Sequence, residues 1–105
     1  MTANDLLSKV KDNLIITFND DDELILSFIA AAIQYAESYQ HVEEGHYQSH
    51  EPSEVTKQGI IMLSSFFYES RDGGTAGYFS NSSAAAEQTF KTVHTLFRLD
   101  RNWKV

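Results

Sequence analysis

Cysteine is absent from this sequence of 105 residues, and proline occurs only once. The lack of cysteine excludes disulfides, thiolate metal ligands and cysteine nucleophiles, and with them a secreted scaffold held by disulfides. No apolar run approaches the roughly 20 residues of a membrane span, and the first residues lack the basic start and apolar middle of a signal peptide. We therefore expect a soluble protein of a reducing cytoplasm, neither exported nor inserted into a membrane.

Basic residues are also scarce, since eight lysines and arginines stand against fifteen acidic residues for a net charge of −7. This negative net charge argues against a protein that binds nucleic acid through phosphate contacts, including a helical DNA-binding regulator. Residues 1–23 carry six acidic and two basic side chains, whereas residues 88–105 carry four basic ones and a single aspartate. This uneven distribution of charge has two interpretations. It either favours self-association, in which the basic tail of one copy meets the acidic surface of another, or reflects two solvated chain ends.

The apolar content, 42% of the residues with 12% aromatic, suffices for one compact domain over residues 1–105 with a single core. Apolar residues recur at helical spacing in four segments, which predict helices over 4–13, 23–42, 52–70 and 84–99. The predicted fold class is all-α, a small bundle of about four helices. A polar, glycine-rich loop over 72–83 and a basic tail over 100–105 complete the chain.

Short signals indicate where these helices begin and what joins them. Asn4 is available as the N-cap of the first helix, and Asp20 with Glu23 fits a capping box for the second. The β-branched and aromatic run over 15–18 is too short for a sheet, so we expect a packed connector there. The polar stretch over 43–51 predicts a loop between the second and third helices.

Four residues bear on how the helices pack. Gly59 lies inside the third helix, where glycine costs roughly 1 kcal/mol relative to alanine. It indicates either the close approach of a neighbouring backbone or merely tolerated sequence. Tyr35 and Tyr39 lie four apart and should share a flank of the second helix. His94 falls on the apolar face of the last helix, which favours a core or interface residue over a catalytic base.

One cluster of histidines and glutamates resembles a metal site, because imidazoles and carboxylates within a short window are able to bind zinc. Its members are His41, Glu43, Glu44, His46, His50 and Glu51. The spacing does not support a site, since His46 and His50 stand four apart in a predicted loop and lack the helical motif of a zinc enzyme. We expect no metal here. The alternative function is a small metal-binding or regulatory helical domain that uses His41, His46 and His50.

Catalytic signatures are missing from the rest of the chain. No serine stands at a glycine-flanked elbow, and no histidine pair has an obvious orienting carboxylate. The glycines at 73, 74 and 77 are not followed by the lysine or helix start that a phosphate cradle requires. The sequence therefore predicts no enzyme and no cofactor.

The order and spacing of several segments resemble the head–tail connector family of tailed phages. In the first half these are LLSKVK at 6–11, DDDEL at 20–24 and IAAAIQYAESY at 29–39. In the second half, a proline followed by an amphipathic helix over 52–63 and the ending FYESR at 67–71 are similar to the corresponding family segment. Family members commonly close on a Tyr-Arg pair near the C-terminus, and Leu96-Phe97-Arg98 stands in its place here.

The resemblance implies a non-enzymatic, structural head-completion adaptor that assembles into a ring of about twelve copies beneath the portal after DNA packaging. The ring would extend the DNA channel, help retain the genome and provide the docking platform for the next head-completion or tail protein. Its partners would be further copies of itself, the portal protein and that downstream protein. DNA would pass without sequence-specific binding, and no membrane is involved. The implied location is the virion head–tail junction, after assembly in the host cytoplasm.

Two segments are expected to contact a neighbouring subunit or the portal. The loop over 72–83 has an aromatic tip and is too long and polar for a simple connection, so it should contact a neighbour or line the channel. The basic C-terminal end has a tryptophan, which either folds back onto the core or contacts a partner, because tryptophan and arginine are enriched among interface anchors. The predicted interface residues are Tyr78, Phe79, Arg98, Arg101, Trp103 and Lys104.

Overall fold

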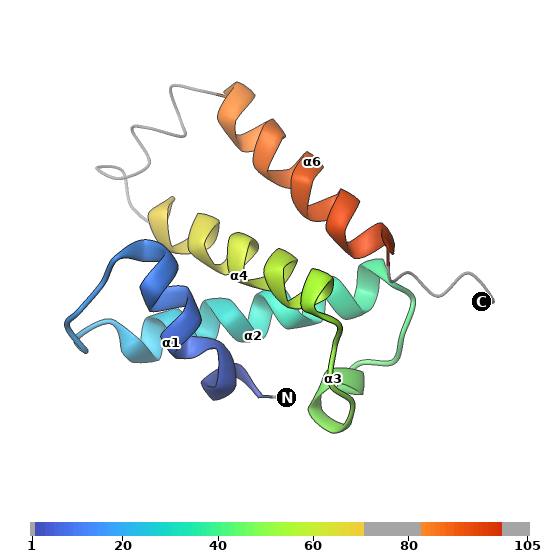
Figure 1. Cartoon of the computed structure of the whole chain (residues 1–105), viewed down its shortest axis with the longest axis horizontal. Coiled ribbons are helices and arrows are strands. Elements are labelled where there is room, and N and C mark those ends of the chain that lie inside the picture. Colours follow the sequence, from blue (N-terminus) through green and yellow to red (C-terminus); the bar gives the residue numbers. More distant parts are fainter. Residues whose placement is uncertain (1, 71–82, 100–105) are drawn as a thin grey trace.

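The computed structural model describes residues 2–70 and 83–99, and every element of secondary structure in these two ranges is a helix (Figure 1). The helices are α1 (Ala3–Leu14), α2 (Asp22–Tyr39), α3 (His46–Ser49), α4 (Glu54–Glu69) and α6 (Ser83–Leu99). The predicted all-α fold is confirmed. Apart from its last residue, which begins α6, the predicted loop over 72–83 lies outside the described residues, as does the predicted tail over 100–105.

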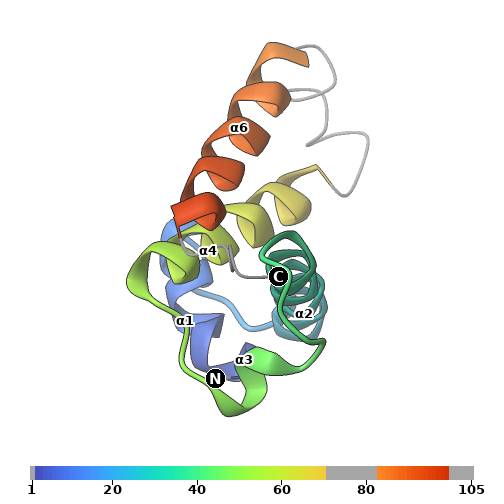
Figure 2. The same cartoon turned by 90° about the vertical axis from the view of Figure 1, so that its right-hand side faces the viewer.

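The two central helices, α2 and α4, pack on each other, and α1 packs against both. α6 lies on the other side of α4, so that α4 separates it from α1 (Figure 2). Apolar residues from all the helices form one buried cluster. Its members are Leu6, Val10, Ile25, Ile29, Ala32, Ile33, Ala36, Tyr47, Ile60, Ile61, Leu63, Tyr68, Val93 and Phe97. Among the described helices, none combines the length and the apolar character needed to cross a membrane.

α1 begins one residue before the predicted N-cap. Thr2 is the N-cap, and its backbone N–H donates to the Asp5 carboxylate (2.8 Å). This bond lowers the pKa of Asp5 below its ordinary value and keeps a negative charge in the first turn, where the helix dipole favours it. Asn4 lies inside the helix, so its predicted role as the N-cap is wrong. The Thr-x-x-Asp spacing that starts at Thr2 determines where the helix begins.

The start of α2 also differs from its prediction. Asp21 is the N-cap and makes no side-chain capping bond. Its carboxylate instead accepts a hydrogen bond from the Tyr68 hydroxyl of α4. The predicted capping box of Asp20 and Glu23 is therefore wrong, because the helix begins at Asp22 and leaves Asp20 outside, exposed to solvent. The N-cap is thus the next aspartate along the chain, and its carboxylate binds a tyrosine of another helix instead of the helix's own backbone N–H groups.

The predicted loop over 43–51 contains α3, a helix of four residues. Gly45 precedes it with φ +84°, a left-handed conformation that glycine adopts without strain. The buried carboxylate of Glu37 in α2 accepts the backbone N–H groups of Gly45 (3.1 Å) and Tyr47 (2.9 Å). The short helix therefore depends on a side chain from another helix, which local sequence patterns do not reveal.

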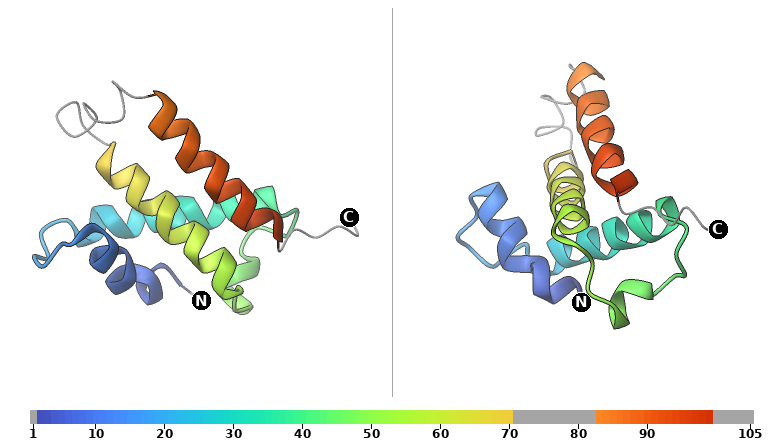
Figure 3. Two further views of the ribbon diagram at one scale, coloured as in Figure 1. Left: turned by 45° about the horizontal axis from the view of Figure 1, so that its top comes forward. Right: turned by 45° about the vertical axis from the view of Figure 1, so that its right-hand side comes forward.

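α4 and α6 run antiparallel side by side (Figures 1 and 3), and Gly59 of α4 lies against Phe97 of α6. A β-carbon built on Gly59 would stand 2.5 Å from Cε1 of Phe97. Phe97 is fully buried, so its ring has no free space to move into. Of the two interpretations offered for Gly59, close approach holds, but the neighbour is an aromatic ring rather than a backbone.

Candidate functional site

The histidines of the segment over 41–51, which carry the alternative metal-binding function, do not converge on one point. His41 follows α2 with φ 61° and is exposed, whereas the rings of His46 and His50 stack with centroids 4.3 Å apart. In residues 2–70 and 83–99, no three histidine, aspartate or glutamate side chains are placed to hold a metal ion. The geometry of this segment is that of a surface turn with two stacked imidazoles.

His94 packs in an aromatic cluster between α2 and α6. Its ring stacks on Tyr39 with centroids 4.9 Å apart, and its Nε2 lies 2.6 Å from the Tyr35 hydroxyl. Burial, with Tyr39 nearby, raises the pKa of Tyr35 above its ordinary value, and the direction of its hydrogen bond to Nε2 follows the tautomer of His94. Because that nitrogen is already engaged, His94 acts as a packing residue here. The two tyrosines share one flank of α2, as their spacing predicts.

A buried amide joins four of the helices at one point, which the sequence analysis did not anticipate. The Gln40 side chain at the end of α2 donates to Thr56 Oγ1 of α4 (2.9 Å) and to the Phe97 carbonyl of α6 (3.0 Å). It also accepts a hydrogen bond from the Tyr47 hydroxyl of α3. The one signal for it is positional, since Gln40 continues the spacing of the buried apolar face of α2 through Ala36.

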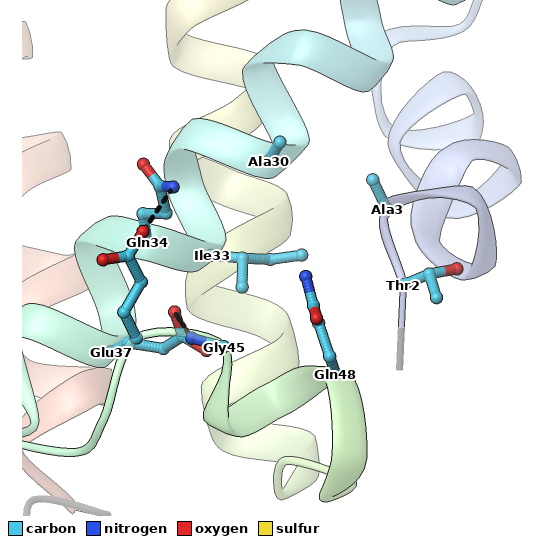
Figure 4. A pocket seen from close by; sticks show the side chains of 9 residues that line it. Thr2, Ala3, Ala30, Ile33, Gln34, Glu37, Gly45 and Gln48 are labelled. Atoms are coloured by element: carbon cyan, nitrogen blue, oxygen red, sulfur yellow. Dashed lines mark hydrogen bonds between the residues drawn. The ribbon is translucent and has the colours of Figure 1, made fainter.

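A groove with a volume of about 600 Å³ runs between the start of α1, α2 and α3 (Figure 4). Its lining residues are Thr2, Ala3, Ala30, Ile33, Gln34, Glu37, Glu44, Gly45 and Gln48. The Glu37 carboxylate in it is occupied by the backbone of α3, and the Gln34 amide donates to Glu44 (3.5 Å). None of the four histidines lines it. The groove therefore offers hydrogen-bonding surface but no pairing of a nucleophile with a base.

The connection between α1 and α2 is held in place from two sides. Lys11 of α1 donates to the side-chain oxygen of Asn19 (2.7 Å) and forms an ion pair with Asp22 (2.8 Å). From α4, Tyr68 bonds to Asp21. Because both neighbouring helices hold it, this connection presents its side chains in a defined arrangement.

Large apolar side chains of this connection nevertheless lie in solvent. Ile15 is 89% exposed and Phe18 49%, and Leu24 in the first turn of α2 is 38% exposed. We call Ile15, Phe18 and Leu24 the turn patch. In the run over 15–18, which was predicted to be a packed connector, only Ile16 packs against the core, so that prediction is wrong at both ends of the run. The left-handed backbone of Ile15 turns the chain so that its neighbour faces inward.

Ile15 ends α1 in a conformation that costs energy. Its backbone lies at φ 59°, ψ 49°, where glycine or asparagine usually stands because a branched β-carbon crowds the backbone. The Ile16 N–H donates to the Lys11 carbonyl (2.9 Å) and closes the helix. Since no glycine or asparagine marks this helix end, local sequence does not predict it.

The end of α6 carries the remaining exposed large hydrophobic residue in the described part of the chain. Leu99 is 67% exposed, and Arg98 beside it is exposed in the last turn. Arg98 is thus placed at a helix end that presents both charge and apolar surface. The other predicted interface residues, Tyr78, Phe79, Arg101, Trp103 and Lys104, lie outside the described residues.

Exposed apolar surfaces of this kind are typical of contacts with other proteins. The model of the family described as "Phage gp6-like head-tail connector protein" matches residues 4–101. No curated protein and no solved structure matches the chain. The family match spans all the described helices but for the first residue of α1, and the family is one of structural phage proteins. The chain therefore belongs to the phage gp6-like head–tail connector family.

Proposed function

We propose that this protein is a head-completion adaptor that forms a closed ring of about twelve copies beneath the portal. The ring extends the DNA channel, helps to retain the packaged genome and provides the docking platform for the next head-completion or tail protein. The observation that carries this proposal is the family match over residues 4–101. The subunit is made in the host cytoplasm and, after assembly, lies at the head–tail junction of the virion.

The charge of the subunit supports a channel through which DNA passes without sticking. Fifteen acidic residues against eight basic ones give each copy a net charge of −7. Repeated around a ring, this charge repels phosphate at the wall and keeps the affinity for DNA low. The acidic beginning and the basic end of the sequence also suit a head-to-tail contact that closes into a ring.

Native mass spectrometry of the protein, alone and with added portal protein, tests this function. A discrete species of about twelve copies, either free or formed on the portal, is the expected result. A protein that stays monomeric with portal present would contradict it. The same spectra test the alternative function, because zinc bound stoichiometrically and lost in His46→Ala and His50→Ala variants would favour a metal-binding domain.

The predicted interface residues are part of this proposal. Tyr78 and Phe79 lie in the loop that contacts a neighbour or lines the channel, so deleting residues 74–82 should spare the helical circular dichroism signal and abolish ring formation. Arg98, Arg101, Trp103 and Lys104 form the basic end that docks on the portal or an adjacent copy. A chain truncated after Leu99 should bind portal more weakly, and normal binding would remove the tail from the interface.

A further inference from the structure

The turn patch lowers the stability of an isolated subunit, because it combines a strained backbone with exposed apolar side chains. Ile15 accepts a left-handed backbone that a β-branched residue rarely adopts, and its side chain buries almost nothing in return. Phe18 and Leu24 expose further apolar surface from the same connection. Lys11 and Tyr68 hold this connection in place, so the exposure is a fixed feature of the fold.

The matching surface lies at the opposite end of the molecule. In Figures 1 and 3 the α1–α2 connection and the last turn of α6 stand at opposite ends of the view. Leu99 at that end is the fourth exposed large hydrophobic residue in the described ranges, and Arg98 precedes it. Since the two ends are far apart in one subunit, they can meet only between two copies.

Charge at the two ends is complementary. The turn patch is flanked by Asp20 and Glu23, both exposed and neither ion-paired to another described residue. At the other end, Arg98 is exposed beside Leu99 in the last turn of α6. The acidic groups beside the turn patch and the arginine beside Leu99 are of opposite charge, and such charges steer two surfaces together and set their register.

We propose that the turn patch of one subunit receives the C-terminal end of α6, with Leu99 and Arg98, from a second copy of this chain. The contact joins different surfaces of identical chains, so it repeats from copy to copy and closes when the rotation permits. Burial against Leu99 compensates for the conformational cost of Ile15. The inference rests on the proposed self-assembly and assigns it an interface.

The absence of cysteine from the chain allows a direct test by cross-linking. Two full-length variants, Phe18→Cys and Leu99→Cys, are mixed in equal amounts and treated with a short bis-maleimide, and the linked pairs are identified by mass spectrometry. We expect Phe18–Leu99 pairs to exceed either homodimer by about tenfold. The matched control replaces Phe18→Cys with Ser8→Cys, an exposed position of α1 outside the turn patch. Leu99→Cys linking as readily to position 8 as to position 18 would overturn the proposal.

A second variant tests the apolar contact without a cross-linker. Asparagine tolerates the left-handed region, so Ile15→Asn should keep the fold and its helical circular dichroism signal while weakening ring formation about tenfold. Ser8→Asn is the control and should assemble normally. Normal rings from Ile15→Asn would overturn this interface and leave the proposed ring intact. Failure of the unaltered protein to form rings on the portal would instead contradict the proposed function, while specific cross-links would still uphold the contact.

Discussion

At Gly59 the smallest residue sets the distance between two helices. The Phe97 ring of α6 occupies the space that a side chain on α4 would need, with Cε1 and Cδ1 only 2.5 Å and 3.0 Å from a built β-carbon. The lost helix propensity of about 1 kcal/mol is the cost of this approach. Burying a phenylalanine ring against α4 recovers more than that.

Gly59→Ala should therefore lower the free energy of unfolding by about 1–2 kcal/mol, because overpacking outweighs the gain in helix propensity. Urea denaturation followed by circular dichroism measures the change. Gln58→Ala, exposed on the same helix, is the control and should stay within about 0.5 kcal/mol of the unaltered protein. A stabilised Gly59→Ala variant would show that α6 moves away from α4 without penalty.

Ile15 should respond to substitution in the opposite way. Ile15→Asn relieves the left-handed strain and loses little buried surface, so the isolated subunit should gain about 1 kcal/mol of stability. Ile16→Asn, one position later, removes a side chain that packs on the core and should lose about 2 kcal/mol. Urea denaturation of dilute protein measures the change in stability of both variants. If Ile15→Asn is more stable but assembles less well, the isoleucine serves the contact between copies and not the stability of the subunit. If Ile15→Asn is less stable, the backbone of Ile15 is not strained.

Among the elements, the long helices could be predicted and α3 could not. α1, α2, α4 and α6 each carry an apolar face at helical spacing, which is a local property of the sequence. α3 has four residues, too few for any periodicity, and it depends on the Glu37 carboxylate of α2. The capping box predicted from Asp20 and Glu23 was wrong for the same kind of reason, since the N-cap is Asp21 and its carboxylate binds Tyr68 of another helix.

Gln40 links α2, α3, α4 and α6, so replacing it should destabilise the packing of all four helices. Gln40→Leu keeps the volume but removes the bonds to Thr56 and to the Phe97 carbonyl, and should cost about 3 kcal/mol of unfolding free energy. Gln34→Leu, exposed on the same helix, is the matched control and should change stability by less than about 0.5 kcal/mol. Equal effects of the two substitutions in urea denaturation would show that the buried amide contributes nothing specific.

For the whole molecule, charge polarity was visible in the sequence, whereas the apolar surfaces were not. Counting charges places acidic residues at one end of the chain and basic residues at the other. Exposure of Ile15 and Leu99 is a tertiary property, because the same residue types are buried elsewhere in the chain. In the described fold, the exposed Asp20 and Glu23 lie beside the turn patch, and the exposed Arg98 lies beside Leu99. In the proposed contact, this combination, more than either feature alone, makes each end specific for the other.

Self-association through these ends should weaken with salt, but only in part. Raising the ionic strength from 0.1 M to 1 M shortens the screening length from about 10 Å to about 3 Å, which removes the attraction of Arg98 for Asp20 and Glu23. The apolar contact of Ile15 with Leu99 persists, since burial does not depend on screening. Sedimentation velocity in the two buffers should show a several-fold weaker association, and Glu23→Gln should reduce this salt dependence. Association that is unchanged at 1 M would mean that the charges at the two ends do not face each other.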